Sequence, residues 1–166
     1  MSSTASWWAS KVRQFRSHVR ARVAPNERDE LAAWLTAPQL ALFDTMHVAD
    51  RRHGLDVVAT LRVDGVAEPD VLVAGLLHDA GKGDTGVGPR IAYSLGQRYG
   101  RWAWRVAGVV PGWGVALRRL ETHAETSADL AGTAGCSTRT VALIRFQDAP
   151  EDPEFGELLR LADEAN

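Results

Sequence analysis

An apolar run at positions 71–77 ends directly in His-Asp-Ala-Gly-Lys at positions 78–82, and this junction limits how the chain can fold. A run of this kind must be buried, and its end carries a histidine and an aspartate into the interior, where unpaired polar groups cost several kcal/mol. Neighbours on a regular helix point about 100° apart. His78 and Asp79 therefore face one point only if the helix ends there, and Gly81 supplies the break. A metal ion would accept an imidazole nitrogen and a carboxylate oxygen together.

Lys82 is one of only two lysines in a chain that has 17 arginines. The chain uses arginine almost everywhere for positive charge, yet it keeps a compact ammonium three residues after Asp79. Lysine commonly serves as a point charge for phosphate. The position is therefore a hint of phosphate binding.

The composition is that of one ordinary globular domain. At 166 residues the chain is long enough for a core without disulfides, and its net charge of −2 argues against a general nucleic-acid surface. The single cysteine, Cys136, excludes an intrachain disulfide and fits a reducing cytoplasm. The first residues do not resemble a signal peptide, and residues 102–117 are interrupted by Arg105 and Pro111. We therefore expect a cytoplasmic protein without a transmembrane segment.

The hydrophobic pattern is helical nearly throughout, with no convincing alternation at period two. Pro25, Pro38 and Pro69 mark helix starts, a longer helix is expected over about 48–63, and glycines make 81–89 a loop. Beyond the loop, helices are expected around Trp102 and Trp104, which suit a core or a dimer surface. More are expected near 115–120, 121–133, 138–147 and 154–165. The pattern predicts an all-α fold, a single compact multi-helix bundle.

Residues 1–24 are predicted to form a basic amphipathic helix. Its apolar stripe has helical spacing, and basic side chains cover the opposite face. Such a helix suits an anionic membrane or RNA, but the simpler interpretation is a terminal helix packed on the domain with a solvated basic face. Residues 25–166 are then the helical domain. The stripe consists of Trp8, Val12, Phe15, Val19 and Val23.

Three polar segments follow one another along the chain. They read Asp-Arg-Arg-His at 50–53, Leu-His-Asp-Ala-Gly-Lys at 77–82 and Leu-Ala-Asp at 161–163. In this order and spacing they resemble the HD superfamily of metal-dependent phosphohydrolases, whose signature is usually written His-Asp-Ile-Gly-Lys. The resemblance covers positions 50–163. It implies that the family's helical domain holds one metal ion through His53, His78, Asp79 and Asp163.

The chemistry of these residue types agrees with the resemblance. Two imidazoles and two carboxylates suit a divalent ion (Mn, Fe, Co, Ni, Mg or Zn) and leave positions open for water and phosphate. The absence of thiolates argues against a structural zinc. A bound ion would lower the pKa of a water and promote hydroxide attack at phosphorus. Asp79 and Lys82 are accordingly predicted to be catalytic, with Lys82 binding the phosphate.

His123 begins a segment, His-Ala-Glu, that resembles the His-Pro-Glu of the two-metal branch of the family, which includes the HD-GYP phosphodiesterases. Phe146 and Gln147 replace the His-His pair that this branch tends to carry on the next helix. One metal is therefore favoured, and a second ion is left open. We predict that His123 is catalytic and substrate-binding, facing phosphate or transferring a proton. Arg90, after the glycine loop, is a further candidate for substrate contact, and a surface position fits it equally well.

The predicted function is hydrolysis of a phosphomonoester or phosphodiester of a small metabolite, with a nucleotide favoured. The alternative is a non-catalytic metal- or nucleotide-binding regulatory domain, because the second metal shell is incomplete. A third class, an oligonucleotide-processing or membrane-surface protein, rests on the basic N-terminal helix. We expect no stable nucleic-acid partner, and a homodimer is left open.

Overall fold

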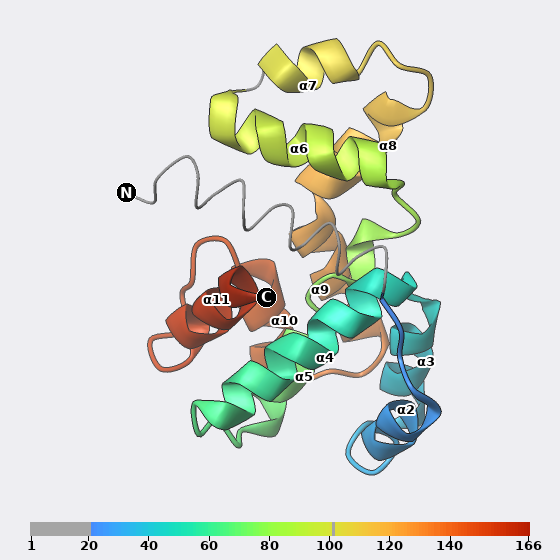
Figure 1. The fold of residues 1–166 in the computed structure, drawn as a ribbon. Coiled ribbons are helices and arrows are strands. Elements are labelled where there is room, and N and C mark those ends of the chain that lie inside the picture. Colours follow the sequence, from blue (N-terminus) through green and yellow to red (C-terminus); the bar gives the residue numbers. More distant parts are fainter. Residues whose placement is uncertain (1–20, 101) are drawn as a thin grey trace.

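The computed structural model describes residues 21–100 and 102–166, and all regular elements in those ranges are helical (Figure 1). The all-α, single compact bundle predicted from the sequence is confirmed. Most of the predicted N-terminal basic helix lies outside the described residues, and residues 21–24 are not helical. In chain order the elements are α2 (Pro25–Leu31), α3 (Ala37–Thr45), α4 (Val48–Val63), α5 (Pro69–Leu77), the 3-10 turn η1 (Ala80–Lys82), α6 (Val87–Tyr99), α7 (Trp102–Ala107), α8 (Trp113–Glu121), α9 (His123–Thr133), α10 (Thr138–Arg145) and α11 (Gly156–Ala165).

Helix α5 forms the centre of the bundle, and each of residues 71–77 is buried. Helices α4 and α10 pack along it, and α3 and α11 also contact it. At Gly75 the side chains of Val57, Leu61 and Leu159 close in, so α4 and α11 meet α5 at this point. The apolar run is therefore a buried helix, as its composition predicts.

Helices α4 and α5 are in close backbone contact at Gly54. A Cβ atom at this position would lie 2.4 Å from the carbonyl oxygen of Leu76, closer than side chains come. The glycine therefore lets α4 rest directly on the backbone of α5. The preceding residue, His53, is thereby brought next to the end of α5.

Helices α6, α7 and α8 form a layer of their own at one end of the bundle, at the top of Figure 1. Trp104 stacks on Tyr93 with ring centroids 5.1 Å apart and lies against Gly96. Trp113 lies against Gly88. Helix α8 joins this α6–α8 layer to η1 and α9. Two of the three tryptophans thus pack inside the layer, whereas Trp102 is exposed.

The glycine loop is shorter than predicted, because η1 comes first and α6 already begins at Val87. Pro89 is the third residue of α6. The missing N–H of a proline in the first turn leaves no helical hydrogen bond unmade, so Pro89 does not end the helix. Among the described helices none is long and apolar enough to cross a membrane.

Candidate metal centre

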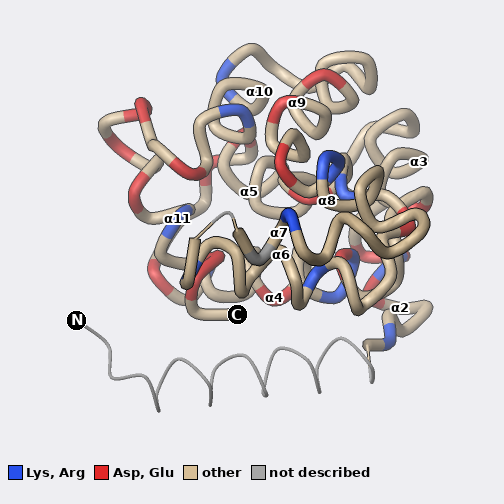
Figure 2. Tube along the Cα trace, turned by 90° about the horizontal axis from the view of Figure 1, so that it is seen from above, with Lys and Arg blue, Asp and Glu red and all other residues tan. Residues whose placement is uncertain are grey.

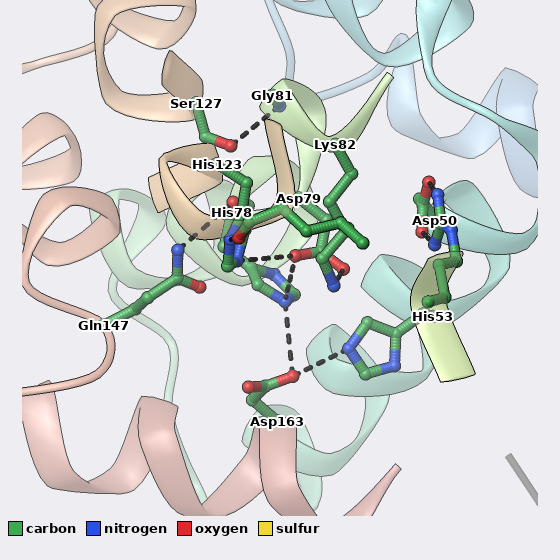
Figure 3. Close-up of polar contacts among 12 residues, drawn as sticks. Asp50, His53, His78, Asp79, Gly81, Lys82, His123, Ser127, Gln147 and Asp163 are labelled. Atoms are coloured by element: carbon green, nitrogen blue, oxygen red, sulfur yellow. Dashed lines mark hydrogen bonds and ion pairs between the residues drawn. The ribbon is translucent and has the colours of Figure 1, made fainter. Parts of the chain in front are cut away.

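The polar pair His78–Asp79 lies where α5 ends. His78 still has helical dihedrals, φ −56° and ψ −24°, whereas Asp79 turns to φ −100° and ψ 5° before η1 begins. The change of backbone turns both side chains to one point, with Oδ1 of Asp79 3.4 Å from Nε2 of His78 (Figure 3). Each side chain is only 2% exposed. The predicted end of the helix at this pair is confirmed.

Gly81 is required for a different reason than the helix break predicted for it. Its φ is not among the positive values, so its backbone conformation does not demand glycine. A Cβ atom would, however, lie 2.6 Å from the carbonyl oxygen of His123 and 2.7 Å from the amide nitrogen of Ser127. The Gly81 N–H also donates to Ser127 Oγ at 2.8 Å. The glycine therefore allows η1 to pack on α9, which places His123 beside Asp79.

Two further helices bring ligand-type side chains to the same point. Nε2 of His53, from α4, lies 2.7 Å from Oδ1 of Asp163, from the last turn of α11. The same oxygen is 3.3 Å from Nε2 of His78. Within the described part of the chain, His53, His78 and Asp163 are a group whose donor atoms all lie within 4.8 Å of one another and could hold a metal ion. Asp79 adjoins this group through its Oδ1 atom.

No protein-family model, curated protein or solved structure matches the chain. The geometry of the site itself therefore carries its interpretation.

Two buried atoms at the centre of the cluster have no hydrogen-bond partner among the residues that the structure describes: Nε2 of His78 and Oδ1 of Asp79. They lie 3.4 Å from each other, and Nε2 lies 3.3 Å from Asp163. Ligand atoms about 2.1 Å from one ion, at angles of about 90–110°, stand roughly 3.0–3.4 Å apart. The separations around His78 therefore match those between neighbouring ligands of one ion.

The other ring nitrogen of two histidines is held by a backbone carbonyl. Nδ1 of His78 lies 2.9 Å from the oxygen of Gly75, and Nδ1 of His123 lies 2.7 Å from the oxygen of Leu120. Because a carbonyl can only accept, each Nδ1 carries a proton, and in the neutral form of each ring the lone pair is at Nε2. Metal-bound histidines are commonly oriented in this way.

The charges of the cluster favour a cation. Burial acts to lower the pKa of His78, but the carboxylates of Asp79 and Asp163 outweigh it and raise that pKa. Burial acts to raise the pKa of Asp79 and of Asp163, yet His78 and the neighbouring positive groups lower both. With neutral imidazoles, the two carboxylates and the ammonium of Lys82 leave one net negative charge. The carboxylates therefore stay ionised and attract a proton or a metal ion to Nε2 of His78.

Lys82 reaches the second oxygen of Asp79 from η1. Its Nζ atom lies 2.5 Å from Oδ2, on the side away from the unpaired Oδ1 (Figure 3). Burial opposes the charge of the ammonium, but Asp79 and Asp50 outweigh it and raise the pKa of Lys82. Lys82 is therefore a fixed positive charge that leaves Oδ1 of Asp79 available. Its predicted contact with phosphate stays a prediction.

His123 begins α9 and points its Nε2 atom at Asp79, 3.7 Å from Oδ1. Burial and the nearby Lys82 lower the pKa of its imidazole. The ring is therefore neutral near pH 7 and offers a lone pair at the edge of the cluster. This position is compatible with the predicted proton transfer and with a second ion.

Asp50, for which the sequence pattern predicts no role, is the main partner of Arg90. Nη1 and Nη2 of Arg90 donate to the two carboxylate oxygens of Asp50 at 2.5 and 2.7 Å, and Nε donates to the carbonyl of Thr85 at 2.9 Å. Asp50 precedes His53 by three residues on α4. The pair therefore ties the glycine loop and α6 to the helix that carries His53. Pairing between residues 40 positions apart leaves no local pattern by which it could have been found.

Gln147 stands in the region where the two-metal branch tends to carry its His-His pair. It is buried, and its amide nitrogen donates to the carbonyl oxygen of His78 at 3.4 Å. The side chain therefore supports the backbone of a predicted ligand. The substitution was visible in the sequence, but this contact was not.

Proposed function

We propose that the protein is a metal-dependent phosphohydrolase of the HD type, in which His53, His78, Asp79 and Asp163 hold one divalent ion. The observation that carries the proposal is the pair of buried atoms without hydrogen bonds, Nε2 of His78 and Oδ1 of Asp79. A buried polar group without a partner costs about 1–3 kcal/mol, and a shared cation would remove this cost at both atoms. The order of the residues along the chain agrees with that of the HD superfamily.

The surrounding side chains could perform the steps that hydrolysis requires. When bound, a divalent ion would acidify a water molecule and turn the net charge of the cluster positive, which favours a phosphate group. Lys82 uses one donor on Asp79, which leaves further ammonium hydrogens for a phosphate oxygen. Nε2 of His123 can accept a proton from the water and return it to the leaving group.

The proposed substrate is a small phosphorylated metabolite, with a nucleotide favoured by the resemblance. Phosphate binding is assigned to Lys82 and His123. A substrate role for Arg90 stays a prediction, since its guanidinium is held by Asp50 and Thr85. The homodimer and the cytoplasmic location considered from the sequence also stay predictions.

The proposal is tested by metal analysis of the purified chain and a phosphatase panel. The panel combines Mn, Mg, Co and Zn with p-nitrophenyl phosphate, bis(p-nitrophenyl) phosphate and nucleoside mono- and triphosphates. We expect one ion per chain, and turnover that a chelator removes and added metal restores. A purified chain that binds none of these divalent ions would contradict the proposed metal site.

The regulatory alternative is favoured by one observation, the contact of Gln147 with the backbone of His78 in place of a second metal shell. A regulatory domain would bind one metal ion and a nucleotide without turning it over. Stoichiometric metal together with no turnover on any panel substrate would select this alternative.

Lys82 offers a test that separates substrate binding from metal binding. Replacing Lys82 by methionine keeps most of the stem and removes the charge beside Asp79. We expect metal content to stay the same, because the cluster becomes more negative, while kcat/KM falls about 10- to 100-fold, or roughly 1.4–3 kcal/mol. Steady-state kinetics and metal analysis on the same preparations measure both effects.

Lys82→Arg is the matched variant, and it should recover only part of the loss because its planar guanidinium places its donors differently. Unchanged kinetics in Lys82→Met would remove Lys82 from phosphate binding. Loss of metal in that variant would make Lys82 a support for Asp79 instead.

A further inference from the structure

The charges of this chain are strongly segregated. Between Asp84 and Glu121 the sequence contains no acidic residue, whereas the rest of the chain from Glu27 onward contains all 21 acidic residues. This basic stretch forms the α6–α8 layer. Aspartates and glutamates lie instead on other helices, such as α9 and α11 (Figure 2). The layer is therefore the basic end of a molecule with a net charge of −2. The arginines of the sequence stretch 85–120 are Arg90, Arg98, Arg101, Arg105, Arg118 and Arg119.

The outer side of α7 exposes large apolar side chains. Trp102, Val106 and Val109 follow one another at spacings of four and three, so they share one face of the helix and its final turn. Their side chains are 61%, 62% and 79% exposed. On the inner side, Trp104 packs against α6. Helix α7 is thus apolar on both faces, although only one of them is buried against the protein.

Charge and apolar exposure coincide at the outermost edge of the molecule. Helix α7 lies farthest from the α4–α5 core in Figure 1. Arg98, near the end of α6, precedes the stripe, and Arg105 lies within it; both are exposed. Arg118 and Arg119 are in the last turn of α8, where Arg119 approaches Gly83 of the glycine loop. Exposed apolar patches rimmed by one kind of charge are typical of interaction surfaces.

We propose that this surface, Trp102, Val106 and Val109 with the neighbouring Arg98 and Arg105, docks on the interface of an anionic phospholipid bilayer. Tryptophan favours the interfacial region of a bilayer, the valines would enter the boundary of the acyl chains, and arginines are attracted by acidic head groups. The proposed attachment is peripheral. None of the described helices is long and apolar enough to cross a membrane. It is independent of the proposed phosphohydrolase activity.

Three other occupants explain the surface less well. Nucleic acid would use the arginines, but exposed valines gain nothing from a phosphate backbone and do not stack on bases. Residues 1–20 carry four basic residues and no acidic one, so like charges oppose their docking on the layer. A second copy joined through the same face would bring the arginines of two layers together, and these like charges would repel each other.

The test is flotation of the full chain with two kinds of vesicle, phosphatidylcholine alone and phosphatidylcholine mixed with phosphatidylglycerol. We expect binding to the mixed vesicles that weakens as salt is raised. The affinity of the double variant Val106→Asp/Val109→Asp for the mixed vesicles should be lower by about tenfold or more, because the variant places charges where the apolar stripe would enter the lipid. Arg98→Glu/Arg105→Glu should also weaken binding. Both variants change only exposed side chains, so circular dichroism should show a retained fold.

The matched control is Val63→Asp, which adds the same charge at a valine that is 87% exposed at the end of α4. It should bind vesicles as the unmodified chain does. Undiminished binding of Val106→Asp/Val109→Asp would assign attachment elsewhere and overturn the proposal. So would equal binding to pure phosphatidylcholine, or binding to a DNA or RNA oligonucleotide without binding to vesicles. A dimer that becomes a monomer in this variant, with no vesicle binding by either form, would make the stripe a self-interface.

Discussion

Replacing Asp79 by alanine is expected to remove bound metal and phosphatase turnover together. Asp79 contributes Oδ1, an unpaired buried oxygen 3.4 Å from Nε2 of His78, and one of the two negative charges that attract a cation to this point. Without it the cluster loses a ligand, and Lys82 loses its partner, so the remaining charge no longer favours a dication. We expect metal content to fall below about a tenth of an ion per chain and turnover to fall about 1000-fold or more, roughly 4 kcal/mol.

Metal analysis and kinetics are measured beside melting curves with and without added metal. In the unmodified chain the metal should raise the melting temperature, because it binds the folded state only, and in Asp79→Ala it should not. Asp84→Ala is the control, since Asp84 is an exposed aspartate of the glycine loop close in sequence. It should retain metal, activity and the metal-induced stabilisation. Stoichiometric metal in folded Asp79→Ala would remove Asp79 from the predicted ligands.

The helices were predictable because their signals are local. Prolines at the starts of α2 and α5 and the apolar run of α5 depend only on neighbouring residues, and the structure confirms them. Boundaries failed where tertiary packing or helix geometry decides them. Pro89 was placed in a loop, although the first turn of α6 tolerates it. Helix α10 ends at Arg145, and α11 starts only at Gly156, after Asp152 accepts hydrogen bonds from the amides of Glu154 and Phe155.

The convergence of His53, His78 and Asp163 was predictable only through the resemblance, since their spacing along the chain says nothing about distance in space. The structure brings these three together. The pairing of Asp50 with Arg90 and the contact of Gln147 with His78 were not predicted, because each joins side chains whose proximity arises only from the packing of distant helices. No role was predicted for Gly54 either, although its lack of a side chain sets the distance between α4 and α5, the two helices that position His53 and His78.

Gly54→Ala is therefore expected to destabilise the fold and the metal site at once. The added Cβ would stand 2.4 Å from the carbonyl oxygen of Leu76, a backbone atom of α5 that cannot move aside as a side-chain end can. Overpacking of this kind costs about 2–3 kcal/mol, more than the roughly 1 kcal/mol that alanine gains over glycine in a helix. Relief of the clash separates α4 from α5, and with them the rings of His53 and His78, whose centroids are 5.2 Å apart.

The free energy of unfolding in urea, measured without metal, should fall by about 1–2 kcal/mol, and metal affinity should fall as well. Gly132→Ala is the matched control within a helix, because its Cβ would meet nothing closer than the side chain of Val141 at 3.7 Å. That variant should be unchanged or more stable by up to about 1 kcal/mol. Equal stability of Gly54→Ala and the unmodified chain would contradict the prediction and mean that the backbone of α5 at Leu76 can move aside without cost. Unchanged metal affinity in a destabilised Gly54→Ala would show that the separation of α4 and α5 does not control the position of His53.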